Sequence, residues 1–437
     1  MLSEKLKKYG VVGAGGAGFP TYVKAESKVE YVIANGAECE PLIHKDFELM
    51  KEYPSEIVEG MKLMMDSTGA KKGKFGIKEK HLEAIEKLEP VIKKNKIDFS
   101  FFGDFYPSGD EYEVVYTATG RLIPPAGIPL QIGCVVNNVE TLYNIFLANQ
   151  EIPITHKIMS VSGVVNEPKT FWIPVGTSFR DLIEIAGGSK VRDFGVFDSG
   201  IMMGNLSFDL DDVVTKTTAG LIILPREHFL ITRKSQPIEN MNRIGKSACD
   251  QCSYCTEFCP RYLLGYEVEP HKVMRSLGFT LTGADNWNQW AELCCACGLC
   301  TLYACPEDLF PKEACDEAKI DMRSAGIKFI QQKEVKVHPM KEHRRVPQKQ
   351  LRKRLKVDEY EVDTPFEKID FSPKMVRIKL QQHIGKKAEP VVTEGERVDA
   401  GQVIATVGEK ELGANIHSSI DGRVTEVNHT FIAIEKF

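Results

Sequence analysis

Residues 249–260, CDQCSYCTEFCP, and residues 294–306, CCACGLCTLYACP, hold the two cysteine runs that decide the organisation of this chain. In each run, cysteines separated by two residues are followed by a further cysteine that precedes a proline. Thiolates at this spacing are typical of a loop that wraps a 4Fe-4S cube, with the fourth sulfur supplied from the start of a helix. The two runs therefore predict a helical, two-cluster ferredoxin-like domain over residues 240–330 that transfers single electrons.

Each cluster is expected to take ligands from both runs, because in two-cluster ferredoxins the fourth cysteine of each run ligates the other cluster. The expected ligand sets are Cys249, Cys252, Cys255 and Cys305 for one cluster, and Cys294, Cys297, Cys300 and Cys259 for the other. Cys294 is preferred to Cys295 because only Cys294 keeps the two-residue spacing to Cys297. The second run has one residue more than usual before its last cysteine, and we expect a one-residue bulge there. A zinc site and a disulfide framework are the alternatives.

Composition limits the remaining classes of function. The chain has 437 residues, of which 43% are hydrophobic and 27% charged, as in soluble globular proteins of several domains. A net charge of −5 argues against nucleic-acid binding. No apolar stretch approaches the roughly 18–20 residues of a membrane span, and the N-terminal sequence lacks the apolar segment of a secretory signal. Twelve cysteines, most of them in the two runs, fit a reducing cytoplasm, which is the expected location.

The rest of the chain predicts three further domains and a linker. Residues 1–150 predict an α/β domain. Its expected elements are a buried strand at 29–35 and helices at 54–68, 78–94 and 139–149. Residues 154–230 alternate strands, turns and one short helix, which predicts a β-grasp domain. Residues 373–437 alternate apolar and polar residues between glycines, which predicts a compact all-β domain. Residues 331–372 are highly charged and are expected to form a linker or a solvated helix, with docking of an acidic partner as the alternative.

A glycine loop lies near the N-terminus, in the sequence GVVGAGGAGFPTYVK. Gly13, Gly15 and Gly18 match the dinucleotide fingerprint G-x-G-x-x-G, and the acid Glu38 follows about 20 residues later. A Rossmann site also requires a full strand before the glycines, whereas LKKYGVV has only two consecutive apolar residues. The glycines therefore predict a backbone that closely approaches a phosphate or a flat ring, without specifying a Rossmann site.

Four segments in order carry a family resemblance. They are GAGGAGFPT (13–21), YVIANGAECEP (31–41), YPSGDEYEVVYTATGR (106–121) and VVNNVET (135–141). They resemble the flavin- and NADH-binding subunit of respiratory complex I, and more closely the family of Rnf C subunits and cobalamin-reductase-like proteins. The β-grasp region resembles the soluble-ligand-binding (SLBB) domain of that family, and residues 413–422 resemble its barrel-sandwich hybrid domain. That domain comes first in the Rnf C subunit and last here, which favours the cobalamin-reductase-like branch.

The resemblance implies an FMN site beside an NADH site. The residues that match the FMN loop, its contacts and a phosphate-binding helix start are Gly13, Gly15, Gly16, Gly18, Lys24, Asn35, Asn137, Asn138 and Thr141. Glu40, Asp110 and Glu111 match family carboxylates near the flavin and the nucleotide. Glu38, the acid that follows the fingerprint, and Phe19, which follows the glycine loop, are also expected at the cofactor site. Ala37, Ile123 and Ala126 replace an aspartate, a lysine and an aromatic of the complex I subunit, which weakens the NADH assignment more than the FMN assignment.

The leading hypothesis is an NADH-dependent oxidoreductase that passes electrons from NADH through FMN and two 4Fe-4S clusters to a partner reductase or corrinoid. It would act in a hetero-oligomeric complex, without a membrane span of its own. Because the cofactors supply the chemistry, no catalytic acid or base is expected. The alternatives are an electron-transfer or docking subunit that does not oxidise NADH, the C subunit of a membrane Rnf complex, and a two-cluster ferredoxin adaptor without flavin.

Overall fold

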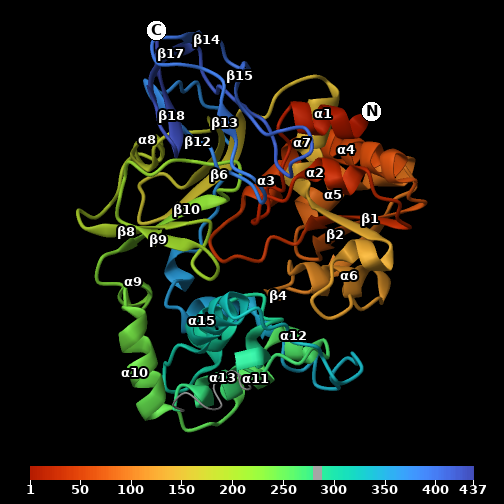
Figure 1. Cartoon of the computed structure of the whole chain (residues 1–437), viewed down its shortest axis with the longest axis vertical. Helices are drawn as coiled ribbons and strands as arrows, with labels where there is room; N and C mark the ends of the chain where they lie inside the picture. The colour runs from red at the N-terminus through yellow and green to blue at the C-terminus, as the bar shows by residue number, and fades with distance from the viewer. Residues whose placement is uncertain (279–287) are drawn as a thin grey trace.

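The structure, a computed structural model, describes residues 1–278 and 288–437. The expected cluster domain at 240–330 therefore includes a stretch that lies outside the described residues. Four differently folded parts follow one another along the chain, and the last part returns to pack beside the first (Figure 1). None of the described helices is long and apolar enough to cross a membrane.

The N-terminal part is an α/β structure on a parallel sheet with the strand order β3-β2-β1-β5. The strands are β1 (Tyr31–Gly36), β2 (Lys72–Lys78), β3 (Asp98–Phe102) and β5 (Cys134–Asn138). The helices are α1 (Leu2–Lys8), α2 (Thr21–Ala25), α3 (Lys45–Glu52), α4 (Pro54–Thr68), α5 (Leu82–Lys94), α6 (Glu111–Thr119), η1 (Pro129–Ile132) and α7 (Val139–Asn149). The strand expected at 29–35 and the helices expected at 54–68 and 139–149 are confirmed as β1, α4 and α7. The helix expected at 78–94 begins only at Leu82, because Lys78 ends β2 and residues 79–81 form the turn that follows it.

The glycine loop precedes the sheet instead of following a strand. It leaves α1, closes on itself through the Gly13 amide, which donates to Phe19 O at 2.9 Å, and enters α2 behind Pro20. At the other side of the site, β1 and β5 end in register, with Asn35 beside Asn138. Ligands bind outside the carboxyl ends of parallel strands. The loop and these strand ends therefore meet where a ligand site is expected, by a route that differs from the Rossmann fold.

The middle part, where a β-grasp domain is expected and which we call the β-grasp part, is a five-stranded mixed sheet with the order β7-β6-β10-β8-β9. Its elements are β6 (His156–Gly163), β7 (Lys169–Pro174), α8 (Phe179–Ile185), β8 (Phe194–Asp198), β9 (Asn205–Ser207) and β10 (Gly220–Pro225). The cysteine-rich part that follows is built from short helices. They are α9 (Phe229–Lys234), α10 (Ile238–Ala248), α11 (Tyr254–Glu257), α12 (Pro260–Leu263), α13 (Pro270–Ser276), η2 (Gln289–Ala291), η3 (Cys300–Ala304) and α15 (Pro311–Ser324).

The C-terminal part is all-β, as the sequence predicts, and consists of two small antiparallel sheets around an aliphatic core. One sheet contains β12 (Met375–Lys379), β14 (Arg397–Val398), β17 (Gly422–Val427) and β18 (Phe431–Lys436). The other contains β13 (Glu389–Pro390), β15 (Val403–Thr406) and β16 (Ile416–His417). We call this part the barrel. It lies at the top of Figure 1, beside α1 and the glycine loop.

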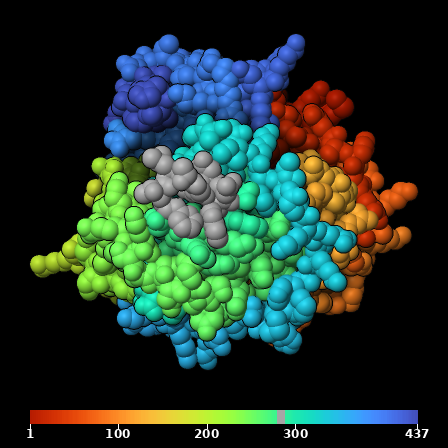
Figure 2. All heavy atoms as spheres, turned by 60° about the horizontal axis from the view of Figure 1, so that its bottom comes forward, coloured from red at the N-terminus to blue at the C-terminus, as the bar shows by residue number. Residues whose placement is uncertain are grey.

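Residues 331–372, which we call the strap, connect the cysteine-rich part to the barrel and contact the N-terminal part on the way. β11 (Val346–Pro347) pairs with β4 (Phe105–Tyr106), and α16 (Gln348–Arg354) buries Leu351 completely before the short η4 (Asp358–Tyr360). Lys341 of the strap also binds within the protein, since its ammonium donates to Glu113 at 2.7 Å. Sky-blue atoms of this region lie between the green cysteine-rich part and the orange N-terminal part in Figure 2.

Candidate flavin and iron–sulfur sites

The four cysteines expected at one cluster line a common hollow. Cys249, Cys252 and Cys255 come from the first run and Cys305 from the second, and all four line the same partly open pocket. Two of the sulfurs already accept hydrogen bonds, from Gln251 Nε2 to Cys249 Sγ at 3.1 Å and from the Leu309 amide to Cys305 Sγ at 3.3 Å. Hydrogen bonds to sulfur favour the thiolate that a cluster needs. The donor set therefore fits a 4Fe-4S cube.

The second group is more deeply buried. Cys259, Cys297 and Cys300 are each less than a tenth exposed. Burial raises the pKa of the Cys259 thiol, and the nearby thiols of Cys295 and Cys294 raise it further. The thiol of Cys300 likewise lies within electrostatic reach of Cys294 and Cys259. The structure thus places Cys259, from the first run, among the cysteines of the second run.

The backbone supports Cys294 as the first ligand of this group. Ala296 and Gly298 have φ values of 57° and 79°, and the corresponding residues of the first run, Gln251 and Ser253, have 62° and 64°. The two loops therefore share one conformation when Cys294 is aligned with Cys249. The Cys294 sulfur also accepts the Ala296 amide at 3.3 Å.

The extra residue of the second run is absorbed as expected. Residues Cys300–Ala304 form a π-helical turn, in which the Cys305 amide donates to Cys300 O at 3.2 Å. A π-turn closes its hydrogen bond one residue later than an α-turn, so it accommodates one inserted residue. The one-residue bulge predicted from the spacing is confirmed.

The buried cysteine group adjoins the N-terminal part. Arg261, two residues after Cys259, forms a nearly buried ion pair with Asp110 at 2.8 Å, and its guanidinium lies 3.4 Å from the ring centre of Tyr112. The Tyr106 hydroxyl donates to Cys297 O at 2.8 Å. Cys252 of the other group is exposed. The two groups therefore differ in position: one is buried next to the flavin domain and the other reaches the surface.

The glycine loop presents an open stretch of backbone above the start of α7. Gly15, Gly16 and Ala17 are exposed, and Gly16 has a φ of 142° with no atom within 4 Å of where a Cβ would stand. A Cβ on Gly15 would lie 3.0 Å from Asn138 Cβ, so this glycine packs on the helix start. The Ala14 amide donates to Thr141 Oγ1 at 2.9 Å. These contacts fix the loop and leave its centre free for a ligand.

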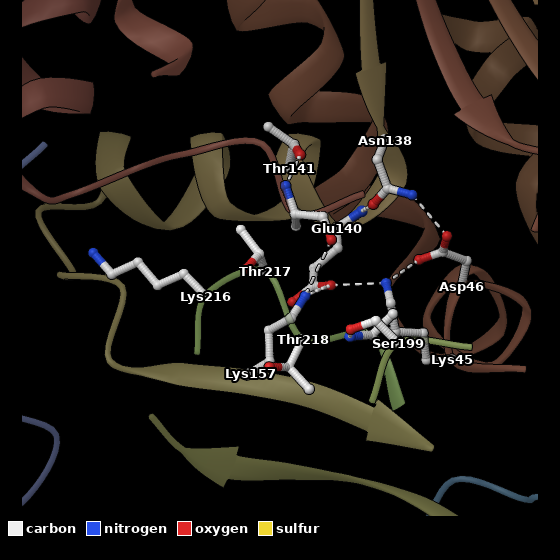
Figure 3. A network of polar contacts seen from close by, with 12 residues as sticks. Lys45, Asp46, Asn138, Glu140, Thr141, Lys157, Ser199, Lys216, Thr217 and Thr218 are labelled. Carbon is white, nitrogen blue, oxygen red and sulfur yellow. Dashed lines mark hydrogen bonds and ion pairs between the residues drawn. The ribbon is translucent and has the colours of Figure 1, made fainter. Parts of the chain in front are cut away.

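A buried ion-pair network, shown in Figure 3, contacts the loop through Lys157, which donates to Ala14 O at 3.4 Å. Glu140 is fully buried and pairs with Lys45 at 2.8 Å and with Lys157, and Lys45 also pairs with Asp46 at 2.6 Å. Burial lowers the pKa of Lys157 to about 8, although Glu140 opposes this shift. Asn138 joins the network through Asp46 at 2.7 Å and caps α7 by accepting the Glu140 amide. The burial and pairing of these charged residues were not predicted from the sequence. The sequence indicates them only by placing the charged residues within apolar runs.

Several expected flavin residues converge at this edge. Lys24 donates to Val136 O at 2.6 Å, and desolvation lowers its pKa while Glu111 opposes the shift. Asn35 donates to Gly109 O at 3.0 Å. The Nδ2 of Asn137 is buried and has no hydrogen-bond partner among the described residues. An unsatisfied buried donor at the end of β5 fits a bound acceptor such as a flavin carbonyl or a phosphate.

Three of the expected carboxylates already form hydrogen bonds or ion pairs within the protein. Glu38 accepts the Asp46 and Phe47 amides at the start of α3, and burial raises its pKa to about 8. Glu40 accepts the Met202 amide from the β-grasp part, and burial raises its pKa to about 7. Asp110 caps α6 and pairs with Arg261, as described above.

Glu111 is the exception among these acids. None of the hydrogen bonds or ion pairs between described residues involves its side chain, and its pKa is raised by burial and lowered by Lys24. Phe19 lies close by, with the Lys24 ammonium 5.9 Å from its ring centre. Glu111 and Phe19 therefore remain available to a ligand, whereas Glu38, Glu40 and Asp110 hold the fold together.

Family profiles match all four parts of the chain. They are the Nuo51 FMN-binding domain over residues 6–147, the SLBB domain over 158–193, the 4Fe-4S dicluster domain over 248–310 and the RnfC barrel sandwich hybrid domain over 355–436. Together with the cysteine groups and the open glycine loop, these matches define a flavo-iron–sulfur electron-transfer protein of the oxidoreductase class.

The chain is similar throughout to cobalamin reductase PduS of Citrobacter freundii, with 37% identity over 99% of this chain and 96% of that protein. The chain belongs to this family of PduS and RnfC proteins. The C subunit of the proton-translocating ferredoxin:NAD(+) oxidoreductase complex of Clostridium ljungdahlii is 31% identical over 59% of this chain and 55% of its own length. Among solved structures, an NAD+-reducing NiFe-hydrogenase shares the fold, with a TM-score of 0.50 and 20% identity over 75% of this chain and 67% of that one.

Proposed function

We propose that this protein oxidises NADH at the glycine-loop site and delivers the electrons through its two cysteine groups to a partner reductase or a corrinoid. When bound, FMN accepts a hydride and releases electrons singly, which clusters can carry. The observation that carries this proposal is the direct connection between the flavin edge and the buried cysteine group, through Asp110–Arg261 and Tyr106–Cys297. The relatives described above, a cobalamin reductase and a subunit of a ferredoxin:NAD(+) oxidoreductase complex, support a corrinoid and a nicotinamide nucleotide as reaction partners.

The proposed ligands combine the sequence motifs with the geometry above. FMN would be held by the residues of the glycine loop, the two strand ends and the start of α7. These are Gly13, Gly15, Gly16, Gly18, Lys24, Asn35, Asn137, Asn138 and Thr141. One cluster would be held by Cys249, Cys252, Cys255 and Cys305, and the other by Cys294, Cys297, Cys300 and Cys259. The domain boundaries proposed for these functions are 1–150, 154–230, 240–330 and 373–437, joined by the strap at 331–372.

The NADH side of the site would depend on Glu111 and Phe19. Both side chains lie near Lys24, and neither has a strong partner among the described residues. A carboxylate at this position can accept hydrogen bonds from the ribose hydroxyls and would repel the 2′-phosphate of NADPH. NADH is therefore the proposed donor.

A second function has its own support. The engagement of Glu38, Glu40 and Asp110 within the protein leaves fewer acids for a nucleotide than the family resemblance implies. A subunit that receives electrons from another protein, and does not oxidise NADH, would need none of them.

Anaerobic mixing of the purified flavin-loaded protein with NADH separates the two functions. Rapid bleaching of the flavin absorbance is expected if the protein itself oxidises NADH. Bound FMN that is reduced by dithionite but not by NADH would favour the second function. Protein that binds no FMN at all would exclude both.

A further inference from the structure

A fully enclosed lysine joins the glycine loop, the β-grasp part and the barrel. Lys216 lies in the turn before β10 and is only 5% exposed. Its ammonium donates to Gly10 O at 2.8 Å and to Asn415 O at 3.2 Å. Its backbone amide donates to Gln382 Oε1 at 2.9 Å. One residue thus binds the segment that leads into the loop and two separate segments of the barrel.

The far end of the glycine loop rests on the same barrel segment. The Ile384 amide donates to Gly18 O at 3.1 Å. A Cβ on Gly18 would lie 2.9 Å from Thr217 Cγ2 and 3.0 Å from Gln382 O, and the residue has a φ of 69°. Both ends of the loop are therefore in tight contact with Lys216 or its neighbours, while Gly15, Gly16 and Ala17 between them stay exposed.

The burial of the Lys216 ammonium is energetically unfavourable for the folded protein. No ion pair within the described parts of the chain involves it, and its ammonium is satisfied by backbone carbonyls. In Figure 3 its side chain points away from the Glu140 network. Burying an unpaired ammonium is unfavourable, and residues that break this rule are most often found where position matters for function.

We propose that Lys216 is a positioning residue for the flavin site, which fixes both ends of the glycine loop against the C-terminal barrel. The barrel is then part of the flavin site, although it lies more than 350 residues from the loop in the sequence. This inference rests on the proposed FMN site. It explains how a domain at the end of the chain can serve a loop at its beginning.

The test is the dissociation constant of FMN, measured by quenching of free FMN fluorescence as it is titrated into deflavinated, cluster-loaded protein. Lys216→Met has a similar length without donors, and we expect it to weaken FMN binding about tenfold or more, since two hydrogen bonds that hold the loop are lost. Gln382→Leu removes the acceptor of the Lys216 amide and should weaken binding in the same direction but less. Lys216→Gln, which keeps an N–H donor, should recover part of the affinity.

Lys387→Met is the matched control, because Lys387 also donates to a backbone carbonyl, His429 O at 2.6 Å, but within the barrel. It should bind FMN like the parent, and all variants should keep the parent iron content. Parent-like affinity in both Lys216→Met and Gln382→Leu would overturn the proposal, as would an equal loss in Lys387→Met. If the parent itself binds no FMN, the proposed function fails instead.

Discussion

Single residues at the flavin edge divide into those that hold the fold and those that can hold a ligand. The sequence predicts four acids near the flavin and nucleotide, yet Glu38, Glu40 and Asp110 are bound to backbone amides or to Arg261. An acid that caps a helix or pairs with an arginine cannot also accept the ribose hydroxyls of a nucleotide without losing those contacts. The NADH hypothesis therefore depends on Glu111.

Glu111→Gln keeps the shape of this side chain and removes its charge. NADH use should fall by about tenfold or more, because a hydrogen bond to a charged group contributes about 1.5–3 kcal/mol. Stopped-flow flavin reduction under anaerobic conditions measures the effect. Cluster reduction by dithionite should keep the parent rate and serves as the control. The nucleotide site is misassigned if the flavin of the variant is reduced at the parent rate and NADH binds with the parent affinity. It is also misassigned if NADPH is the better donor.

Lys216 should also give the protein a pH-dependent stability. Burial lowers the pKa of Lys216 from its ordinary 10.5 to about 7, and the buried His417 and His383 are the titratable groups that face it. Between these two values the unfolded chain holds a proton that the folded chain has released, so the free energy of unfolding rises with pH. The Lys216→Met variant lacks this contribution.

Chemical denaturation of parent and Lys216→Met at several pH values isolates the effect, since all other groups titrate in both proteins. The difference between the two free energies of unfolding, parent minus variant, should increase from about pH 7 to pH 10. Below pH 7 this difference should be constant. Parallel curves over the whole range would show that Lys216 stays charged in the folded protein.

Elements with a regular period or a ligand spacing could be predicted from the sequence, and elements held by distant partners could not. The helices α4 and α7, the buried β1 and the π-turn at Cys300–Ala304 follow from apolar periodicity and cysteine spacing. The strap has neither signal, because its order comes from pairing with β4 and from the Lys341–Glu113 ion pair. The same holds for Lys45 and Lys157, whose pairing with Glu140 depends on three separate elements.

The two cysteine loops of the cysteine-rich part distinguish Cys294 from its neighbour Cys295. Their shared backbone conformation assigns Cys294, and not Cys295, to the position of Cys249. Cys294→Ser should lower the iron content of anaerobically purified protein, whereas Cys295→Ser should keep about eight irons and eight acid-labile sulfides per chain. The reverse result would place Cys295 in the ligand set. A parent value near four irons would exclude the second cluster altogether.

At the scale of the whole molecule, the arrangement of the parts sets the order in which electrons can pass. The N-terminal part contacts the buried cysteine group through Arg261 and Tyr106, and the other group reaches the surface at Cys252. Parts that are far apart in the sequence support this arrangement, since the strap and the barrel both bind the N-terminal part. The group with Cys252 is the expected exit to the partner.

Breaking each group separately tests this order. Cys252→Ala should impair the surface cluster, and NADH should still reduce the flavin and the buried cluster, while electron delivery to added cob(II)alamin is lost. Cys297→Ala should impair the buried cluster, and the surface cluster should then be reduced by dithionite but no longer by NADH, because its connection to the flavin is interrupted. Anaerobic freeze-quench EPR distinguishes the clusters, and about four irons should remain in each variant if one cube is retained. Fast reduction of the surface cluster by NADH in Cys297→Ala would show that electrons reach it without passing the buried group, and the serial order would then be wrong.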